Sequence, residues 1–313
     1  MNKLIVSSSP HIKTAKETPR IMLDVIIALL PTLIAGVIIY GFRAVAVVAT
    51  CMFTSVVSEY IFNIATKKEQ TVFDLSAIVT GLILGLSLRA DAPLWQCVIG
   101  SVFAIVVVKC LFGGLGTNFA NPAATGRIFL LVCFSGTLAG GTRPFISSNP
   151  DLVAGATPLE VIANGGELPS LLDMFLGFKG GAIGEVCILA ILIGFVYLVV
   201  RKVIHFETPL IMVATVFLLS LIIDGSATTA LYHVLAGGLV YGAVFMATDY
   251  VTTPITRTGK MIFAFGCGLM VYLIRKYGNY PDGTSFAILF MNILSPYIEG
   301  WTKPRAFGKR GKN

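Results

Sequence analysis

Long apolar runs recur along this chain from Met22 to Ile298, and most of them are separated by short polar connections. A helix needs about 20 apolar residues to cross the hydrocarbon core of a bilayer, which is roughly 30 Å thick. No water is available there to bind backbone N–H and C=O groups, so repeated crossings are made by helices, whose backbone bonds are internal. Charged residues make up only 12% of the 313 positions, whereas soluble domains contain about 25%. The sequence therefore predicts an all-α integral membrane protein.

We expect about ten membrane-spanning helices, of which the third and seventh are short for a bilayer. Short or interrupted spans are tolerated where neighbouring protein or a cavity satisfies the backbone. The expected spans are Met22–Tyr40, Ala44–Ala65, Ser76–Leu88, Leu94–Leu111, Ala124–Leu138, Gly181–Val200, Leu210–Ile223, Leu231–Ala247, Met261–Ile274 and Ser285–Ile298. The preceding segment, 1–21, is polar, which argues against a cleavable signal peptide and for insertion directed by the first span.

The net charge of +7 is distributed in a way that indicates membrane topology rather than binding of nucleic acid. With the N-terminus inside, 17 of the 23 Lys and Arg residues fall on the inner side of the expected spans. The six on the outer side are Arg43, Arg89, Arg143, Lys179, Arg275 and Lys276. Cytoplasmic connections carry the excess of Lys and Arg. We therefore expect both termini, including the basic tail 299–313, on the cytoplasmic side of a bacterial or archaeal inner membrane, and the polar interval 139–180 outside.

That polar interval divides the expected spans into two groups of five, over residues 22–138 and 181–298. An odd number of spans per group inverts the second group relative to the first, so we expect two inverted five-helix repeats. Weak internal similarity agrees, because segments 88–93 and 246–250 each precede a Pro-containing polar break by a similar interval. Inverted repeats of this kind usually hold a binding site between the halves, near the bilayer midplane.

The same polar interval contains Gly155-Ala156-Thr157, followed by Pro158 and Glu160. These residues match a capping box with Thr157 as the N-cap, so an ordinary helix start is one interpretation. The other is that the Thr157 hydroxyl is esterified to the phosphate of flavin mononucleotide (FMN). Gly155 and Ala156 are small enough for a flavin and a modifying enzyme to approach the backbone, and the free N–H groups of a helix start favour an anion. Taken alone, the residues leave both interpretations open.

A glycine-rich block runs from Gly113 to Ala123 and includes Asn118 and Asn121. It is not a dinucleotide-binding fingerprint, because no strand precedes it. Its glycines allow close packing, and the two amides offer paired donors and acceptors. A tight cytoplasmic turn and a polar wall for a flavin or an ion are both compatible with these residues.

Two carboxylates, Glu59 and Asp249, are candidates for an ion pathway. An acid inside the membrane is costly, and by default it suggests a functional site. Placement near a helix end, where water lowers that cost, is the alternative for each. No metal centre is expected, because no two of the six cysteines are spaced as Cys-x-x-Cys.

With these residues, the chain resembles the family that contains the D-type subunit of the Rnf complex, an ion-translocating ferredoxin:NAD+ oxidoreductase, and the B-type subunit of the sodium-translocating NADH:quinone reductase. The resemblance covers nearly the whole length, and the short polar N-terminus is closer to the Rnf member. It rests on the blocks 113–116 with 121–123, on 155–157, on 248–249, and on 280–283 running into 286–292.

The resemblance implies that an ApbE-type FAD:protein FMN transferase attaches FMN to Thr157 through a phosphodiester bond. The family sequence there is (Ser/Asp)-Gly-Ala-Thr, and this chain has Ala154 at its first position. The resemblance also implies a multi-subunit complex, electron exchange with another FMN-bearing subunit on the outer face, and coupled transport of Na+ or H+. The quinone-reductase relative holds a second, noncovalent flavin, riboflavin, and no motif in this chain identifies a pocket for one.

We therefore expect a flavin-bearing subunit that works within a redox-driven complex and is not catalytic alone. Its redox steps are expected to bias conformations that move an ion. A stand-alone small-solute transporter or channel on the same scaffold, with Thr157 purely as a cap, is the alternative. An assembly scaffold without a cofactor is a third interpretation.

Overall fold

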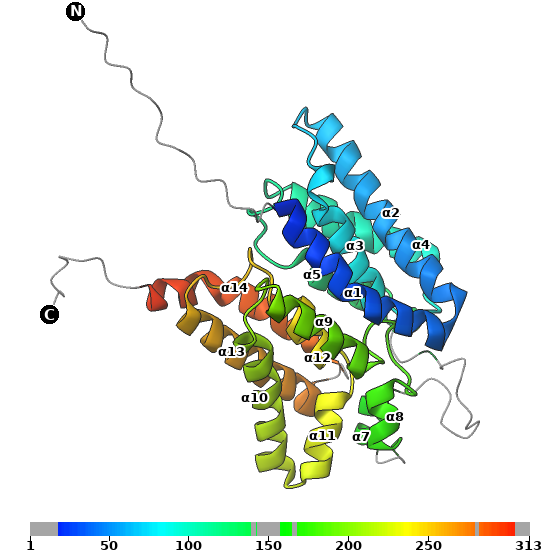
Figure 1. The fold of residues 1–313 in the computed structure, drawn as a ribbon, viewed down its shortest axis with the longest axis vertical. Helices are drawn as coiled ribbons and strands as arrows, with labels where there is room; N and C mark the ends of the chain where they lie inside the picture. The colour runs from blue at the N-terminus through cyan, green and yellow to red at the C-terminus, as the bar shows by residue number, and fades with distance from the viewer. Residues whose placement is uncertain (1–17, 139–141, 143–156, 165–167, 279–281, 304–313) are drawn as a thin grey trace, which may run out of the picture.

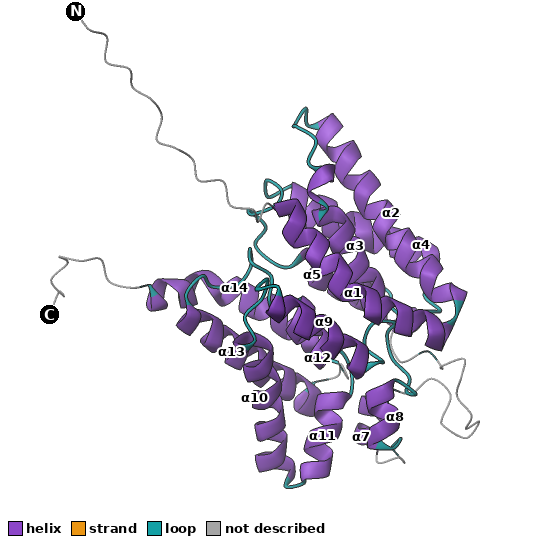
Figure 2. Ribbon diagram, in the orientation of Figure 1, coloured by secondary structure: helices purple, strands orange, loops and turns teal. Residues whose placement is uncertain are grey.

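The computed structural model describes residues 18–138, 142, 157–164, 168–278 and 282–303 (Figure 1). Within these ranges every regular element is a helix (Figure 2). The one β-type contact among them is an isolated bridge between Thr142 and Gly181. The expectation of an all-α chain is confirmed.

The first group of helices precedes the loop region and corresponds to the five spans expected there. It consists of α1 (Thr18–Tyr40), α2 (Phe42–Ala65), α3 (Ser76–Ser87), α4 (Leu94–Val102) continued by the π-helix η2 (Phe103–Cys110), and α5 (Pro122–Cys133). Gly41, with a φ of 72°, makes the sharp turn between α1 and α2, a left-handed conformation that suits a residue without Cβ. Two short elements, η1 (Val72–Asp74) and α6 (Ser135–Leu138), accompany this group.

The second group of helices follows the loop region. It consists of α9 (Ile188–Val200), α10 (Glu207–Asp224), α11 (Ala227–Leu235), α12 (Leu239–Phe245), α13 (Arg257–Tyr277) and α14 (Thr284–Thr302). Two short helices, α7 (Pro158–Asn164) and α8 (Leu171–Leu176), come between the groups. They lie beside α11 at one end of the molecule (Figure 1).

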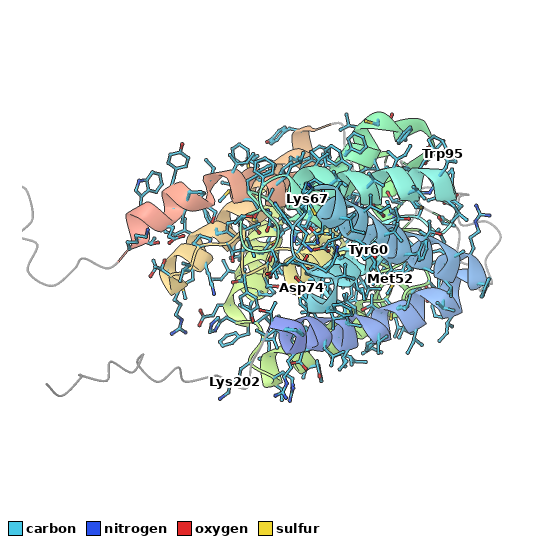
Figure 3. The ribbon with its side chains drawn as sticks, turned by 90° about the horizontal axis from the view of Figure 1, so that it is seen from above. Met52, Tyr60, Lys67, Asp74, Trp95 and Lys202 are labelled. Atoms are coloured by element: carbon cyan, nitrogen blue, oxygen red, sulfur yellow. The ribbon has the colours of Figure 1, made fainter. Side chains whose placement is uncertain are left out.

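Among the described helices, four are long and apolar enough to cross a membrane, namely α1, α2, α10 and α13. The pair α11–α12, bent by 53°, is long and apolar enough when taken together to be a broken span or a re-entrant segment, and α3, α4–η2, α5 and α9 are shorter apolar helices. α3 tolerates its length of 12 residues because all of them except Ile78 are buried by neighbouring protein. Large side chains on the outside, such as Tyr60 at 50% and Trp95 at 55% exposure, form the kind of apolar surface that lipid covers (Figure 3). The chain is a multi-pass membrane protein.

The two groups pack in the same internal order. α2 packs against α3 and α4, and α10 packs correspondingly against α11–α12 and α13. Between the groups, α1 packs against α9, and α5 packs against α14. The first helix of one group therefore contacts the first helix of the other, and the last helix of one contacts the last helix of the other. Equivalent charged pairs follow this pattern. Lys109 in η2 donates to Glu59 on α2 at 2.9 Å, and Lys276 on α13 donates to Asp224 on α10 at 2.5 Å.

The span expected over Gly181–Val200 differs from the helix observed, because α9 begins only at Ile188. Residues 181–187 instead run beside the C-terminal end of α3. There the N–H groups of Ile183 and Gly184 donate to carbonyls of the α3 end at 3.0 and 2.7 Å. These bonds compete successfully with helix formation and bring a charged residue of this segment into the interior.

Two other expected spans are divided. The span expected over Ala124–Leu138 separates into α5 and α6 at Phe134. The span expected over Leu231–Ala247 breaks into α11 and α12, where Gly237 has a φ of 64°. A break in a membrane helix is tolerated where protein groups satisfy the freed backbone, and the groups that do so here belong to the site described next.

Candidate functional site

Thr157 begins α7 in the geometry of a capping box. Its N–H donates to Oε2 of Glu160 at 2.7 Å, and the N–H of Glu160 donates to Oγ1 of Thr157 at 3.3 Å. Pro158 occupies the first helical position. The cap is therefore present, and the Thr157 residue is half-buried. Gly155 and Ala156 lie outside the described residues.

A cleft of about 870 Å³, its open mouth included, lies beside Thr157. Its basic lining residues are Arg89, Arg127 and Lys179, and its apolar ones are Leu88, Leu131, Leu138 and Leu159. Mostly apolar walls with a few convergent charges are typical of cofactor sites.

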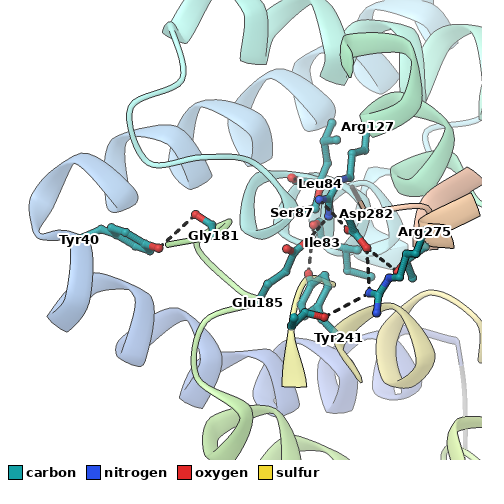
Figure 4. A network of polar contacts seen from close by, with 12 residues as sticks. Tyr40, Ile83, Leu84, Ser87, Arg127, Gly181, Glu185, Tyr241, Arg275 and Asp282 are labelled. Atoms are coloured by element: carbon teal, nitrogen blue, oxygen red, sulfur yellow. Dashed lines mark hydrogen bonds and ion pairs between the residues drawn. The ribbon is translucent and has the colours of Figure 1, made fainter. Parts of the chain in front are cut away.

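Three residues that line this cleft form a buried ionic network. Arg127 on α5 donates to Oε1 of Glu185 and, at 3.2 Å, to Oδ2 of Asp282 (Figure 4). Arg127 is 9% exposed and Glu185 is 4% exposed. Charges this far from water are tolerated only when they are paired and hydrogen-bonded. Because Glu185 lies just before α9 and Asp282 between α13 and α14, the network joins the two groups of helices.

Arg275 on α13 holds the other oxygen of Asp282. Its Nη2 donates to Oδ1 of Asp282 at 3.3 Å, and the Thr284 hydroxyl donates to the same oxygen at 2.7 Å. Arg275 also donates to the main-chain oxygens of His233 at 2.5 Å and Ala236 at 3.2 Å. The several donors of a guanidinium thus satisfy both a carboxylate and the free carbonyls at the end of α11.

Glycines at the α11–α12 break make room for the two carboxylates. A Cβ added at Gly238 would lie 2.6 Å from Oε1 of Glu185 and 3.0 Å from Oδ2 of Asp282. Gly237, with its positive φ, would place a Cβ 2.7 Å from a methyl carbon of Leu159. Only a residue without a side chain allows acidic oxygens to approach the backbone this closely.

Lys179, between α8 and α9, reaches the same break. Its Nζ donates to the main-chain oxygen of Leu235, the last residue of α11. Tyr40 fixes the segment next to it by donating to the Gly181 carbonyl at 3.1 Å. Lys179 is 3% exposed, and this burial lowers the pKa of its ammonium to about 8, although the negative charge of Glu185 opposes the shift.

A second cavity of about 780 Å³, its mouth included, lies at the other end of α3. Ser76, the first residue of α3, lines this cavity, whereas Ser87, the last, lines the cleft beside Thr157. Asn118, Asn121 and Asp249 all line it. The structure therefore brings together three of the residues that the sequence singles out, at a site separate from Thr157.

The two asparagines differ in how their amides are used. Asn121 caps α5, since its Oδ1 accepts from the N–H groups of Ala123 and Ala124, and its Nδ2 donates to the Met246 carbonyl at 3.2 Å. Asn118 donates from Nδ2 to the Ala120 carbonyl at 3.0 Å, but its Oδ1 is buried without a partner among the described residues. A buried acceptor left unsatisfied costs about 1–3 kcal/mol, so a ligand that donates to it is favoured.

Asp249 and Glu59 are placed differently. Asp249 follows α12, and its carboxylate accepts from the N–H of Val251 at 3.3 Å and the Thr252 hydroxyl at 3.1 Å. Glu59 is 1% exposed, and both of its oxygens accept from Lys109 at 2.9 Å. Lys109 lines the cavity and Glu59 does not. Glu59 is therefore linked to the cavity that contains Asp249 only through the side chain of Lys109.

Two packed helices, one from each half, separate the two cavities. Tyr241 on α12 is 1% exposed and donates to the Ile83 carbonyl of α3 at 3.1 Å (Figure 4). Ile83 lines the second cavity, while the ends of α3 and α12 nearer Thr157 contribute Ser87 and the adjoining Gly237 to the first.

The residues of this ionic network, Arg127, Glu185 and Asp282, are not among the site residues predicted from the sequence. Arg127 counts there among the inner-side cations, but the structure places it within α5, in the same cleft as the outer-side residues Arg89 and Lys179. A charged residue within an apolar run is the signal that could have identified it, because such a charge persists only with a partner.

Comparison with known proteins gives consistent results over the whole chain. The sequence model of the NQR2, RnfD, RnfE family matches residues 5–308. The chain is 45% identical over 309 residues to the D-type subunit of the Na+-translocating ferredoxin:NAD+ oxidoreductase complex of Acetobacterium woodii, a match that covers 97% of this chain and 95% of that protein. It is 38% identical to the D-type subunit of the proton-translocating ferredoxin:NAD+ oxidoreductase complex of Clostridium ljungdahlii, over 99% and 97% of the two chains. It is 36% identical to the D-type subunit of the ion-translocating oxidoreductase complex of Stutzerimonas stutzeri, over 94% and 93%.

Proposed function

Because the chain belongs to the NQR2, RnfD, RnfE family, we propose that it is the flavin-bearing membrane subunit of an ion-translocating ferredoxin:NAD+ oxidoreductase complex. In this proposal FMN is bound to Thr157 through a phosphodiester, and electron transfer is coupled to movement of Na+ or H+. One relative is named for Na+ translocation and another for proton translocation, so family membership leaves the ion open.

The observation that carries the proposal is the position of Thr157 at a cleft that suits a flavin. The leucine side chains that line the cleft offer an apolar surface to a planar ring. Arg89, Arg127 and Lys179 line the same space together with Glu160, Glu185 and Asp282. Arg89 and Arg127 are paired with carboxylates. Among the described residues Lys179 bonds a carbonyl instead, and its charge favours both a phosphodiester anion and the negative charge that a flavin gains on reduction. The residues present therefore fit the group.

The chemistry of electron transfer belongs to the flavin, which accepts and passes on electrons when bound. The protein supplies position and charge. Attachment through Thr157 keeps the effective concentration of the cofactor high on a side of the membrane where a free flavin would diffuse away. The capping box is compatible with attachment if the Glu160 carboxylate, which accepts from the Thr157 N–H, turns away from the added phosphate.

The cavity lined by Asn118, Asn121 and Asp249 is the place we propose for a second, noncovalent flavin of the riboflavin type. Asn118 lines this cavity, and its Oδ1, unpartnered among the described residues, fits a ring N–H donor. Glu59 and Asp249 stay in the proposal as groups of the ion pathway, the first through its bond to Lys109.

We also propose a topology and a set of partners. The excess of Lys and Arg places both termini in the cytoplasm and Thr157 outside. On that side an ApbE-type transferase attaches FMN, and another FMN-bearing subunit of the complex exchanges electrons with it. The remaining subunits and the lipid bilayer surround the apolar outer face.

Coexpression with an FAD:protein FMN transferase tests the attachment. Ultraviolet fluorescence of the denatured band is expected for the wild type and absent for Thr157→Asn. Asparagine is as good a helix cap as threonine, so this variant keeps the cap and removes only the esterifiable hydroxyl. Thr228→Ala, in the Gly-Ser-Ala-Thr segment at the start of α11, is the matched control and stays fluorescent. A fluorescent Thr157→Asn band would place the flavin elsewhere, and a dark wild-type band would favour the transporter or scaffold interpretations.

A further inference from the structure

We propose that Leu159 is the positioning residue for the flavin, and that Gly237 leaves the notch that receives its side chain. The inference rests on the proposed function, because it concerns FMN bound to Thr157. Leu159 fastens the start of α7 to the end of α11 and so keeps Thr157 at the cleft. The attached flavin is therefore held at a fixed place rather than on a loose tether.

α7 is too short to persist without packing against other elements. It has seven residues, and isolated helices shorter than about 12–15 residues are marginal in water. Among the described residues, the hydrogen bonds of α7 are internal. The capping box joins Thr157 to Glu160, and the N–H of Val161 donates to the Thr157 carbonyl at 3.0 Å. Contacts between apolar side chains are therefore what holds α7 in place.

Burial in α7 is concentrated directly after Thr157. Pro158 and Leu159 are buried, whereas residues 160–162 are half-buried. Two residues of chain span at most about 7 Å, so the place of Leu159 fixes that of Thr157 within narrow limits. A side chain anchored at this position controls the attachment point directly.

Leu159 belongs to an apolar cluster to which three elements contribute. The buried members are Leu159, Met174 on α8 and Ala236 next to the end of α11, and the side chains of Ile162, Tyr232 and Leu235 pack against them. The Tyr232 hydroxyl donates to the Pro169 carbonyl at 2.9 Å and so holds the segment before α8 beside α11. The surface against which Leu159 packs is therefore fixed independently of α7.

Gly237 leaves the space that Leu159 occupies. A Cβ added at Gly237 would lie 2.7 Å from Cδ1 of Leu159, so a larger residue there would displace the leucine. Thr157, Leu159 and Gly237 all line the cleft. The same Cβ would lie 3.1 Å from Oδ1 of Asp282, so the notch adjoins the ionic network. Leu159 therefore sets the distance between the attachment point and the buried charges of that network.

Iodide quenching of flavin fluorescence tests the proposal on the purified full-length chain, loaded with FMN by coexpression with an FAD:protein FMN transferase. Leu159→Ala keeps Thr157 and Glu160, so the denatured band is expected to be as fluorescent as that of the wild type. Without the anchor the flavin leaves the cleft for part of the time. The Stern–Volmer constant for iodide is then expected to rise at least about twofold. The Tm of the helix bundle is expected to stay near that of the wild type, because a short element packed at one end opens locally.

Leu159→Met nearly conserves the volume of the side chain and is expected to keep the wild-type quenching constant. Val161→Ala truncates a side chain of the same helix that lies outside the cluster, and this matched control is expected to behave as the wild type. Size-exclusion profiles and helical circular dichroism identify variants that fail to fold. If Leu159→Ala does not fold, Leu159→Val, which removes a single methylene, takes its place with the same expected direction.

A folded, FMN-bearing Leu159→Ala protein with the quenching constant of the wild type overturns the proposal. An equal rise in Val161→Ala overturns it as well, because the effect would then not belong to the cluster. Both results leave the attachment of FMN to Thr157 intact. A wild-type protein without FMN contradicts the proposed function itself, and this inference with it.

Discussion

Arg127 donates to Oδ2 of Asp282 across 3.2 Å, and so joins α5 in the first group of helices to the segment just before α14 in the second. The same guanidinium binds Glu185, and Arg275 binds the other oxygen of Asp282. The halves are thus connected by charges in a region with little water. A change of charge in the adjoining cleft acts directly on this connection.

Arg127→Gln is expected to destabilise the protein strongly, because it leaves Glu185 and Asp282 buried with one cation fewer. Removing one partner of a buried ion pair costs about 3–5 kcal/mol. Thermal unfolding in detergent, followed by intrinsic fluorescence, measures the change. Arg257→Gln breaks a pair in which the arginine is 75% exposed and is expected to leave Tm nearly unchanged. Equal Tm values for the two variants would show that the network is not a structural joint.

Gly238→Ala tests the close approach at the helix break. The added Cβ would lie 2.6 Å from Oε1 of Glu185, and overpacking of this kind costs about 1–3 kcal/mol. Gly300→Ala is the control, because a Cβ there meets no atom within 4 Å, and alanine is the better helix former. The expected result is a lower Tm for the first variant and an equal or higher one for the second. A Gly238→Ala protein as stable as the wild type would refute the packing described here.

Arg89→Gln is expected to lower the midpoint potential of a flavin in the cleft. Arg89 lines the cleft and pairs with Asp91, so the variant removes a positive charge and leaves a negative one. Less stabilisation of the reduced, more negative flavin means a lower potential, and about 1 kcal/mol corresponds to about 40 mV for one electron. Spectroelectrochemical titration measures the shift. Lys276→Gln, outside the cleft, is expected to leave the potential unchanged. An unchanged potential in both variants would show that Arg89 does not act on the flavin.

Asp249→Asn is expected to reduce redox-driven ion uptake several-fold while electron transfer continues. The carboxylate lines the second cavity with Asn118 and Asn121, and its neutralisation removes the charge that attracts a cation. Uptake into vesicles that contain the reconstituted complex is the measurement. Asp173→Asn, at the start of α8, serves as the control. Uptake equal to the wild type in both variants would remove Asp249 from the pathway.

The helix content and the two groups of five follow from hydropathy, because a bilayer forces apolar runs into helices. The breaks do not follow from it. Apart from Glu185, residues 181–187 and the Gly237–Gly238 step are apolar or small. Long-range bonds to α3 and to Arg275 decide that they are not helical. The local sequence pattern does not predict such tertiary contacts.

The site was predictable to the extent that single residues carry a signal. Thr157 stands in a recognisable motif, and Asn118, Asn121 and Asp249, chosen separately, prove to line one cavity. The pairing of Arg127 with Glu185 and Asp282 was not predictable, since 58 and 155 positions separate the partners in the sequence. Glu59 is buried within the protein, and its bond to Lys109 was not predictable, because it depends on how α2 packs against η2.

Mass spectrometry of the peptide that contains Thr157, taken from the native, active complex, tests the central claim most directly. We predict that the peptide carries the mass of an FMN group and that fragmentation localises it to the threonine. An unmodified peptide from a complex with full electron-transfer activity would contradict the account.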